Sequence, residues 1–262
     1  MAHTIYNNFI IENKLEDILT THLDLNQFCT QDTSLTEEAG MTKKIHKYTA
    51  TGNVEDLAMG EGNTGDIEVS FTEVPYVVGT TQGRFAYYDE QEMTDPMVID
   101  AGLNGVASKM ANDLTAKVIA EFETASLSQT YTAANGIGFD TVVDAIAKLN
   151  LEEETGLFLV ISPADLAKVR KNLKDELKYV EAFVRTGYVG SVCGVPVYVS
   201  KACEAGHAYL ATNEAVTVFT KKGMEVEQER DANVRKNTVY GRKVALVALT
   251  NDTKIVKIVP SV

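Results

Sequence analysis

Hydrophobic positions repeat at helical spacing in one central segment of this chain and alternate at strand spacing on either side of it. After Thr94-Asp95-Pro96, apolar residues recur at steps of three and four as far as Phe122. This spacing predicts one long helix over residues 95–124, roughly 45 Å in length. Thr94 offers a capping side chain, Asp95 an acid near the positive end, and Pro96 a residue suited to the first turn.

A polar segment, residues 41–75, alternates only weakly and is rich in glycine, threonine and charge. Strand-like runs at 47–51 and 66–72 flank the turn residues Gly52-Asn53 and Gly60-Glu-Gly-Asn-Thr-Gly65. The pattern predicts an extended β-hairpin. Its apolar residues are too few for a core of its own, and an isolated two-stranded hairpin is barely stable in water.

Residues 1–40 are predicted to form an arm that begins with a short helix. The apolar stripe of this helix consists of Ile10, Ile11, Leu15, Ile18 and Leu19. A helix this short is marginal in water by itself. We therefore expect it to dock on the body of the chain or on a neighbour.

Residues 137–220 combine helical and strand patterns and are predicted to form a compact α/β unit. Asp140 is expected to cap a helix, and the wholly apolar run Leu157–Ile161 is expected to be a buried strand. Ser162-Pro-Ala-Asp165 matches a capping box that begins the next helix.

A glycine-punctuated segment within this unit predicts a sharply turning loop followed by a strand. Gly187, Gly190 and Gly194 permit backbone conformations with positive φ, and a valine-rich run follows them at once. Pro196 lies in that run and has no N–H to donate. The strand is therefore expected at a sheet edge, or bonded on one side only.

Within residues 76–92, strand-like runs at 76–78 and 84–88 also precede the long helix, and strand patterns return over 223–262. Asn251-Asp252 separates the last two strand-like runs and predicts a hairpin between them. The mixture of segregated strands, one long helix and an α/β unit places the chain in the α+β class.

Composition narrows the classes of function. The 262 residues carry a formal net charge of −13, the opposite of the basic balance that nucleic-acid binders need. The three cysteines lack paired spacing and are expected to be reduced thiols of a protein made in a cytoplasm. No apolar run is long enough to span a bilayer, and the first residues do not resemble a secretory signal.

Candidate chemistry is sparse. Gly60-x-Gly-x-x-Gly65 matches the dinucleotide fingerprint as a string, but a polar stretch precedes it and a strand pattern follows, so it is interpreted as a hairpin tip. The four histidines are scattered and none has a partner at zinc spacing. No convergent set of catalytic groups can be assembled. We therefore predict no catalytic, cofactor or metal site, and no cofactor.

The order of these parts resembles the major capsid protein of tailed bacteriophages, which has the Hong Kong 97-like fold. The segments that carry the resemblance are Glu90–Pro96 entering the helix, Ile161-Ser-Pro163, Gly187–Ser200, and Lys222–Glu227 followed by Arg230-Asp231. The resemblance covers nearly the whole chain.

The resemblance implies a structural protein, not an enzyme. It divides the chain into an N-terminal arm (1–40), an extended loop (41–75), a peripheral domain with one spine helix (76–136 and 221–262) and an axial domain (137–220). Subunits of this kind form pentamers and hexamers of an icosahedral head around double-stranded DNA, without sequence-specific binding. Further expected partners are scaffold, portal and decoration proteins, and no membrane. The expected location is the virion, after synthesis in the host bacterial cytoplasm.

Twelve residues at turns, helix starts and the glycine segment are candidates for assembly contacts: Lys47, Gly52, Asn53, Gly60, Gly62, Gly65, Asp95, Pro96, Gly187, Gly190, Gly194 and Pro196. Three alternatives stay open. An encapsulin shell protein shares the fold but encloses enzymes, a cytosolic α/β enzyme would need a convergent polar pocket, and a tail or decoration protein would not need the long helix.

Overall fold

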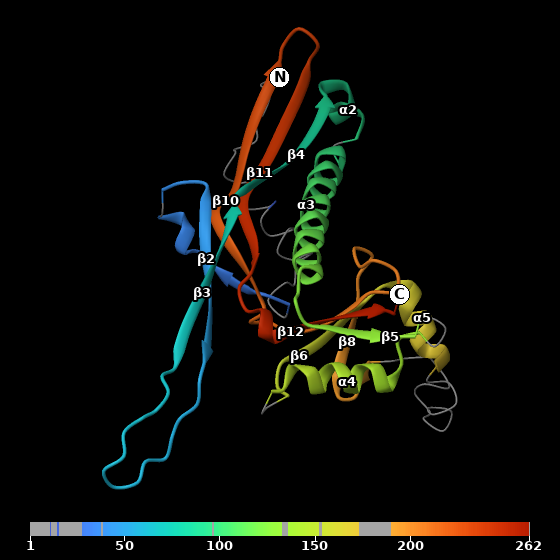
Figure 1. Ribbon diagram of the computed structural model, residues 1–262. Coiled ribbons are helices and arrows are strands. Elements are labelled where there is room, and N and C mark those ends of the chain that lie inside the picture. The colour runs from blue at the N-terminus through green and yellow to red at the C-terminus, as the bar shows by residue number, and fades with distance from the viewer. Residues whose placement is uncertain are drawn as a thin grey trace.

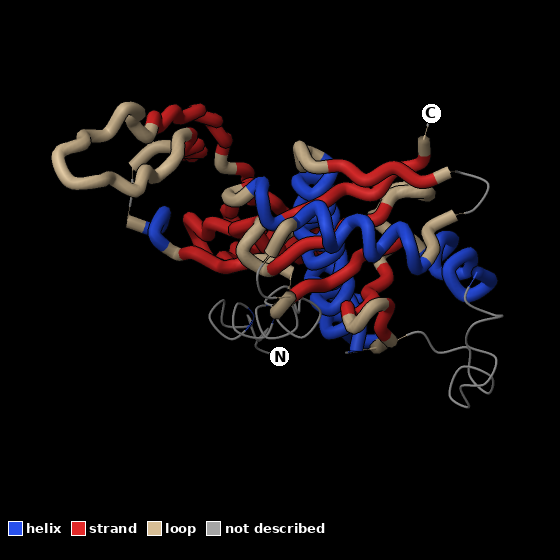
Figure 2. Tube along the Cα trace, turned by 60° about the horizontal axis from the view of Figure 1, so that its bottom comes forward, coloured by secondary structure: helices blue, strands red, loops and turns tan. Residues whose placement is uncertain are grey.

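A computed structural model of the chain describes residues 11, 15, 28–37, 39–95, 97–132, 136–151, 154–172 and 190–261. Figure 1 shows a long helix and a tall β-ribbon that rise from an α/β unit, with a separate hairpin that projects to the side. Figure 2, from another direction, also shows this hairpin standing clear of the body. The predicted α+β class is confirmed.

The tall part pairs the long helix with a four-stranded sheet. The helix, α3, runs from Met97 to Glu123, where the apolar period predicted it. The sheet has the order β1-β10-β11-β4, in which β4, β11 and β10 are antiparallel and β1 is parallel to β10. Its strands are β1 (Thr30–Asp32), β4 (Gly79–Tyr88), β10 (Val216–Asp231) and β11 (Lys236–Leu249). A short helix, α2 (Asp89–Thr94), connects β4 to α3, and a 3-10 turn, η1 (Ser34–Thr36), follows β1.

The apolar stripe of α3 faces this sheet. Leu103, Ala107 and Met110 are buried against side chains of β10 and β11. Ile11 and Leu15, the two described residues of the predicted N-terminal helix, are helical and buried in the same cluster. These two residues of the arm therefore dock on the chain's own body.

Close packing of α3 on β4 depends on two glycines, Gly83, which faces Val106, and Gly102. A Cβ added to Gly102 would lie 2.3 Å from ring atoms of Phe85. Gly105, one turn further along the same helix, faces open space.

We predict that Gly102→Ala lowers the free energy of unfolding by about 1–3 kcal/mol, because the ring and helix must separate. Gly105→Ala is the matched control and is expected to raise it by up to about 1 kcal/mol through helix propensity. Urea unfolding of both variants measures the difference. Equal effects of the two substitutions would contradict the close contact.

The α/β unit is built on a six-stranded sheet of order β5-β12-β9-β6-β8-β7. The strands are β5 (Ser128–Tyr131), β6 (Leu157–Ile161), β7 (Ser191–Val192), β8 (Val195–Val199), β9 (Ala208–Thr212) and β12 (Ile255–Pro260). Every residue of β6 is buried, as predicted, and β6 is followed by the helix α5 (Pro163–Asn172). Helix α4 (Phe139–Leu149) packs its buried side chains against the same core.

The projecting hairpin consists of β2 (Thr42–Thr51) and β3 (Glu68–Val77), which form a two-stranded antiparallel sheet. Residues 52–67 form its tip. The extended hairpin predicted from the turn residues is thus confirmed.

Three local predictions differ from the structure. Asn251-Asp252 does not turn a hairpin: a 3-10 turn, η2 (Asp252–Lys254), carries the chain into another sheet, where β12 pairs with β5 and β9. Asp140 lies in the first turn of α4, whose N-cap is Gly138. Thr94 ends α2, where its hydroxyl donates to the Glu90 carbonyl, and does not cap α3.

Candidate assembly surfaces

The base of the hairpin turns one face toward the chain's own body. The half-buried Ile45 and Tyr76 pack against the core beneath the hairpin. Lys43 Nζ lies 4.7 Å from the centroid of the Phe219 ring, which is part of that core. One side of the hairpin is therefore held by the subunit itself.

The opposite face of the hairpin exposes aromatic side chains beside the Lys44–Glu73 ion pair. Tyr48 and Phe71 are paired across the strands, are 67% and 65% exposed, and have ring centroids 6.2 Å apart. The His46 ring lies 5.8 Å from Phe71, and Val69 is also exposed. Aromatic side chains that bury large areas dominate interface energetics. This surface, defined by His46, Tyr48, Val69 and Phe71 and called here the aromatic face, is a candidate contact for another chain.

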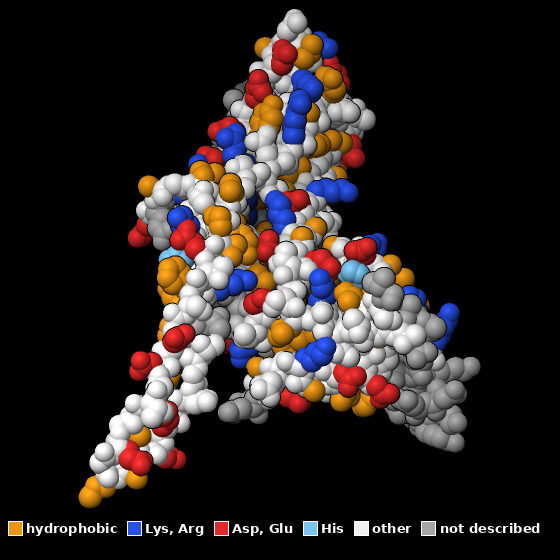
Figure 3. Space-filling model, in the orientation of Figure 1, with side chains coloured by type: hydrophobic (Ala, Val, Ile, Leu, Met, Phe, Trp, Pro, Cys, Tyr) orange, Lys and Arg blue, Asp and Glu red, His pale blue; other side chains and the backbone are white. Residues whose placement is uncertain are grey.

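The tip of the hairpin is internally organised and acidic. Glu55 accepts hydrogen bonds from the Thr64 hydroxyl, at 2.6 Å, and from its backbone N–H, at 2.8 Å. The Thr64 hydroxyl is the main cause of a lowered pKa of Glu55. Val54 and Met59 are almost fully exposed beside it, and Figure 3 shows hydrophobic and acidic side chains at this end. No lysine or arginine occurs between residues 48 and 83.

The glycines of the tip carry no nucleotide-binding geometry. Gly60, Gly62 and Gly65 lie in the loop between β2 and β3, so no helix follows them as the dinucleotide fingerprint requires. Gly52 and Asn53 begin the same loop, directly after β2. The interpretation of this string as a hairpin tip is therefore confirmed.

Gly52 combines a positive φ with a close approach of neighbouring backbone atoms. Its φ is +139°, and an added Cβ would lie 2.9 Å from the Asp66 carbonyl oxygen and from Ile67 Cα. We predict that Gly52→Ala opens the tip locally at a cost of about 1–3 kcal/mol. Amide hydrogen exchange of residues 50–68 should rise about tenfold, while Gly62→Ala, which meets open space, should leave it unchanged. Unchanged exchange in Gly52→Ala would contradict the prediction.

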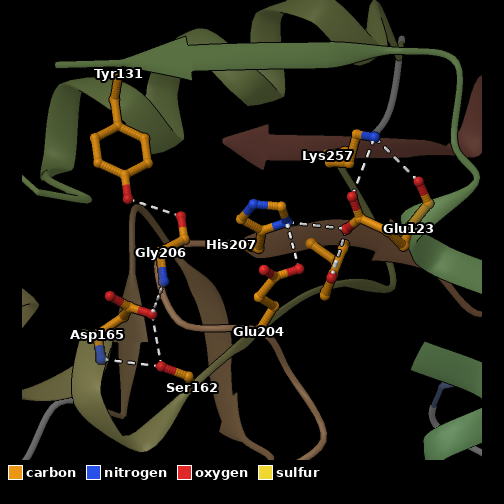
Figure 4. Close-up of polar contacts among 9 residues, drawn as sticks. Glu123, Tyr131, Ser162, Asp165, Glu204, Gly206, His207 and Lys257 are labelled. Carbon is orange, nitrogen blue, oxygen red and sulfur yellow. Dashed lines mark hydrogen bonds and ion pairs between the residues drawn. The ribbon is translucent and has the colours of Figure 1, made fainter. Parts of the chain in front are cut away.

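The last turn of α3 places one carboxylate against the α/β unit. Glu123 Oε2 accepts from the Tyr209 hydroxyl at 2.7 Å and lies 3.1 Å from His207 Nδ1. Lys257 Nζ lies 3.3 Å from the other carboxylate oxygen (Figure 4). Burial raises the pKa of Glu123, but the bonds from His207 and Tyr209 outweigh it, so its pKa is below the usual range.

A second carboxylate of the same turn faces the base of the hairpin. The Leu249 backbone, the Lys47 ammonium and the Tyr76 hydroxyl each act to lower the pKa of Glu121. Burial outweighs these contacts and raises the pKa of Glu121. Lys47 also lies 4.0 Å from Asp252. The candidate Lys47 thus faces the chain's own body.

A buried acid organises the loop before β9. Asp165 is fully buried, and its Oδ2 accepts from the Ser162 hydroxyl at 2.6 Å and the Gly206 N–H at 2.7 Å. The Asp165 N–H in turn donates to Ser162 Oγ at 3.2 Å, which is the first of the two bonds of the predicted capping box, while the Asp165 carboxylate accepts from the Ser162 hydroxyl. The Tyr131 hydroxyl donates to the Gly206 carbonyl at 2.7 Å (Figure 4).

Chemical sites are not evident in the described part of the chain. Among these residues no group of three or more His, Cys, Asp or Glu side chains is placed to hold a metal ion. The described helices include none long and apolar enough to cross a membrane. A polar hollow of about 690 Å³ lies beside Asn150, Thr212 and Lys254, and its lining contains no cysteine, histidine or serine.

Comparison with known proteins decides the family. The model of the family described as "Phage capsid protein" matches residues 71–258, which is well over half of the chain. This chain belongs to the phage capsid protein family. The major capsid protein of Staphylococcus phage phiMR11 is 24% identical to it over 265 aligned positions, covering 96% of this chain and 94% of that protein.

Solved capsid structures share the fold of this phage capsid protein. The capsid of a native GTA particle superposes with a TM-score of 0.70 at 13% identity, over 92% of this chain and 91% of that one. A chain of Mycobacterium phage Che8 gives a TM-score of 0.66 at 16% identity, over 84% and 85%. The expected Hong Kong 97-like fold is confirmed, and the encapsulin alternative is not favoured.

The structure positions the remaining candidate residues in this phage capsid protein as follows. Asp95 caps α3, since its carboxylate accepts from the Met97 N–H at 2.9 Å. Gly190 precedes β7, and Gly194, with a φ of +80°, turns β7 into β8. Pro196 pairs with Ser191 on one side only, because β6 pairs with β8 from Val197 onward, as the sequence predicted. Pro96 and Gly187 lie outside the described residues.

Sequence reasoning missed the carboxylates at the end of α3 and their partners. Glu121 and Glu123 lie within a recognisable helix, but their partners are far away along the chain. One signal was present. Two acids at the C-terminal end of a helix face the negative end of its dipole, where cations are usually preferred. Acidic residues at this end of a helix therefore indicate stabilising partners outside the helix.

Proposed function

We propose that this phage capsid protein is the major capsid protein of a virion. In this proposal many copies assemble into pentamers and hexamers, and these tile an icosahedral head around double-stranded DNA. The observation that carries the proposal is the family match over residues 71–258. The phage relative, which aligns over nearly the full length of both chains, supports it.

The form of the subunit supports self-assembly on physical grounds. The hairpin projects from the body and exposes the aromatic face, which the subunit does not cover. In a closed symmetric shell, each projecting hairpin can lie against the surface of a neighbouring subunit. Many weak contacts of this kind then add up over the whole shell. Binding of DNA phosphates requires positive charge, whereas this chain has a net charge of −13. The shell is therefore proposed to enclose the DNA without binding its phosphates strongly.

We assign domains on the same basis. Residues 1–40 are the arm, 41–75 the extended loop that contacts a neighbour, 76–136 with 221–262 the peripheral domain, and 137–220 the axial domain. Scaffold, portal and decoration proteins are proposed partners. The role is structural and not enzymatic, and synthesis takes place in the host bacterial cytoplasm.

Assembly of the purified full-length chain tests this function. Sedimentation velocity and negative-stain electron microscopy are expected to show capsomers or closed shells. Their population should increase with protein concentration, because association is governed by mass action. A homogeneous monomer across the micromolar range would overturn the proposal, above all if it bound a small molecule saturably.

A further inference from the structure

The last turn of α3 contacts every major part of the subunit. Phe122 is 1% exposed, and its ring centroid lies 6.1 Å from that of Phe158 in β6 and 5.9 Å from that of Tyr209 in β9. Its two neighbours in sequence, Glu121 and Glu123, make polar contacts in different directions. Residues 121–123 thus place one buried aromatic ring between two carboxylates.

The contacts of Glu121 bind this turn to the hairpin. Burial raises the pKa of Glu121, and the Lys47 ammonium of β2 and the Tyr76 hydroxyl at the base of β3 act against this by favouring the charged carboxylate. Lys47 also lies 4.0 Å from Asp252, whose carboxylate accepts from the Ser126 N–H at 3.0 Å. The base of the hairpin is therefore tied to the end of α3 and to the segment that follows it.

The contacts of Glu123 bind the same turn to the α/β unit. Tyr209 and His207 approach from β9 and the loop before it, and Lys257 approaches from β12. Lys257 Nζ also donates to the Glu123 backbone carbonyl at 3.1 Å, so it satisfies a free acceptor of the helix end (Figure 4). Two separate strands of the sheet thus hold one residue of α3.

Helix stability does not account for these two acids. The last turn of α3 contains no basic residue, and negative charge at this end opposes the helix dipole. The favourable interactions of Glu121 and Glu123 come from the hairpin and from the α/β unit. Their shared position on one helical turn therefore links two parts that have few other contacts.

We infer that Glu121, Phe122 and Glu123 form a coupling joint, in which the two carboxylates are positioning residues that hold the hairpin and the α/β unit at one relative orientation on α3. The consequence for a shell rests on the proposed function. If both parts meet neighbouring copies, the joint sets the angle between these contacts and hence the curvature of the shell.

Removing one hydroxyl on the α/β side tests the coupling. In the full-length chain, Tyr209→Phe should raise amide hydrogen exchange about fivefold at residues 42–47 and 72–77 of the hairpin base, in addition to residues 207–211. The matched control is Tyr198→Phe, which removes a hydroxyl from β8 of the same unit, where the ring packs edge-on against Phe28. Its effect should stay within the α/β unit.

The reciprocal experiment uses the hairpin side. Because coupling between sites is reciprocal, Tyr76→Phe should raise exchange at residues 207–211 by a similar factor. Its control is Tyr240→Phe, whose hydroxyl bonds Glu229 at 3.0 Å on the sheet. Effects confined to the mutated side in both variants would overturn the joint.

The assembly readout separates this inference from the proposed function. Wild-type chains should form shells of one diameter, whereas Glu123→Gln, which keeps one acceptor oxygen but loses the charge, should broaden the diameter distribution in negative-stain images. A single wild-type diameter in Glu123→Gln shells would count against the joint. Failure of the wild-type chain to assemble would refute the proposed function but leave the exchange test decisive.

Discussion

Removing Tyr48–Phe71 and closing the chain with an Asn-Gly turn is expected to abolish shell assembly while leaving the subunit folded. Lys47 and Thr72 are paired across β2 and β3, so a two-residue turn fits the register. Among the described residues, none of the deleted segment is buried. The free energy of unfolding should therefore change by less than about 1 kcal/mol. The deletion removes the aromatic face and the acidic tip. The subunit then lacks the surfaces with which the hairpin is proposed to contact a neighbouring subunit.

Thermal unfolding of the truncated chain tests whether the subunit stays folded. Sedimentation velocity tests whether shell assembly is lost. A full-length control, Tyr48→Ser with Phe71→Ser, keeps the hairpin but removes its two exposed rings. Each ring buried in an interface contributes about 1–3 kcal/mol, so the control should need a higher protein concentration to assemble. Normal shells from the truncated chain would show that the hairpin is not an assembly contact.

Elements governed by local patterns were predictable from the sequence. Helix α3 follows from apolar steps of three and four, which depend only on neighbours along the chain. The β2–β3 hairpin follows from turn residues between strand-like runs, and the side-chain cap by Ser162 follows from a spacing of three. Each of these signals is contained within a few turns or strand lengths.

Elements decided by distant partners were not predictable in the same way. Asn251-Asp252 resembles the turn of a hairpin, yet the strand that follows, with Ile255, Val256 and Ile258 buried, pairs with β9 and β5 instead of returning to β11. The choice depends on which sheet buries this apolar strand, and no local turn residue encodes it. The same holds for Glu123, whose partners at 207, 209 and 257 come together only when β9 pairs with β12.

Asp165→Asn is expected to lower the free energy of unfolding by about 2–4 kcal/mol at neutral pH. The carboxylate is fully buried and accepts from Ser162, Gly206 and Lys168. An amide of the same shape has one acceptor oxygen, and its NH₂ group would face a donor. Lys168→Met is the matched control, since the lysine is half-exposed and its loss should cost less than about 1 kcal/mol. Urea unfolding at pH 7 compares the two variants with the wild type.

The pH dependence of the unfolding free energies of the wild type and Asp165→Asn tests whether the charge of Asp165 causes this difference. Burial raises the pKa of Asp165, but the hydrogen bonds from Ser162 and Gly206 and the Lys168 ammonium outweigh it, so the pKa lies below its usual value. A carboxyl whose folded pKa is lowered contributes stability that is complete above its unfolded pKa of about 3.9 and is lost as the pH falls through the folded pKa. The difference between wild type and Asp165→Asn should therefore be constant from pH 7 to about pH 5 and should shrink below about pH 4. A difference that stays constant down to pH 2 would mean that the charge of Asp165 does not stabilise the loop before β9.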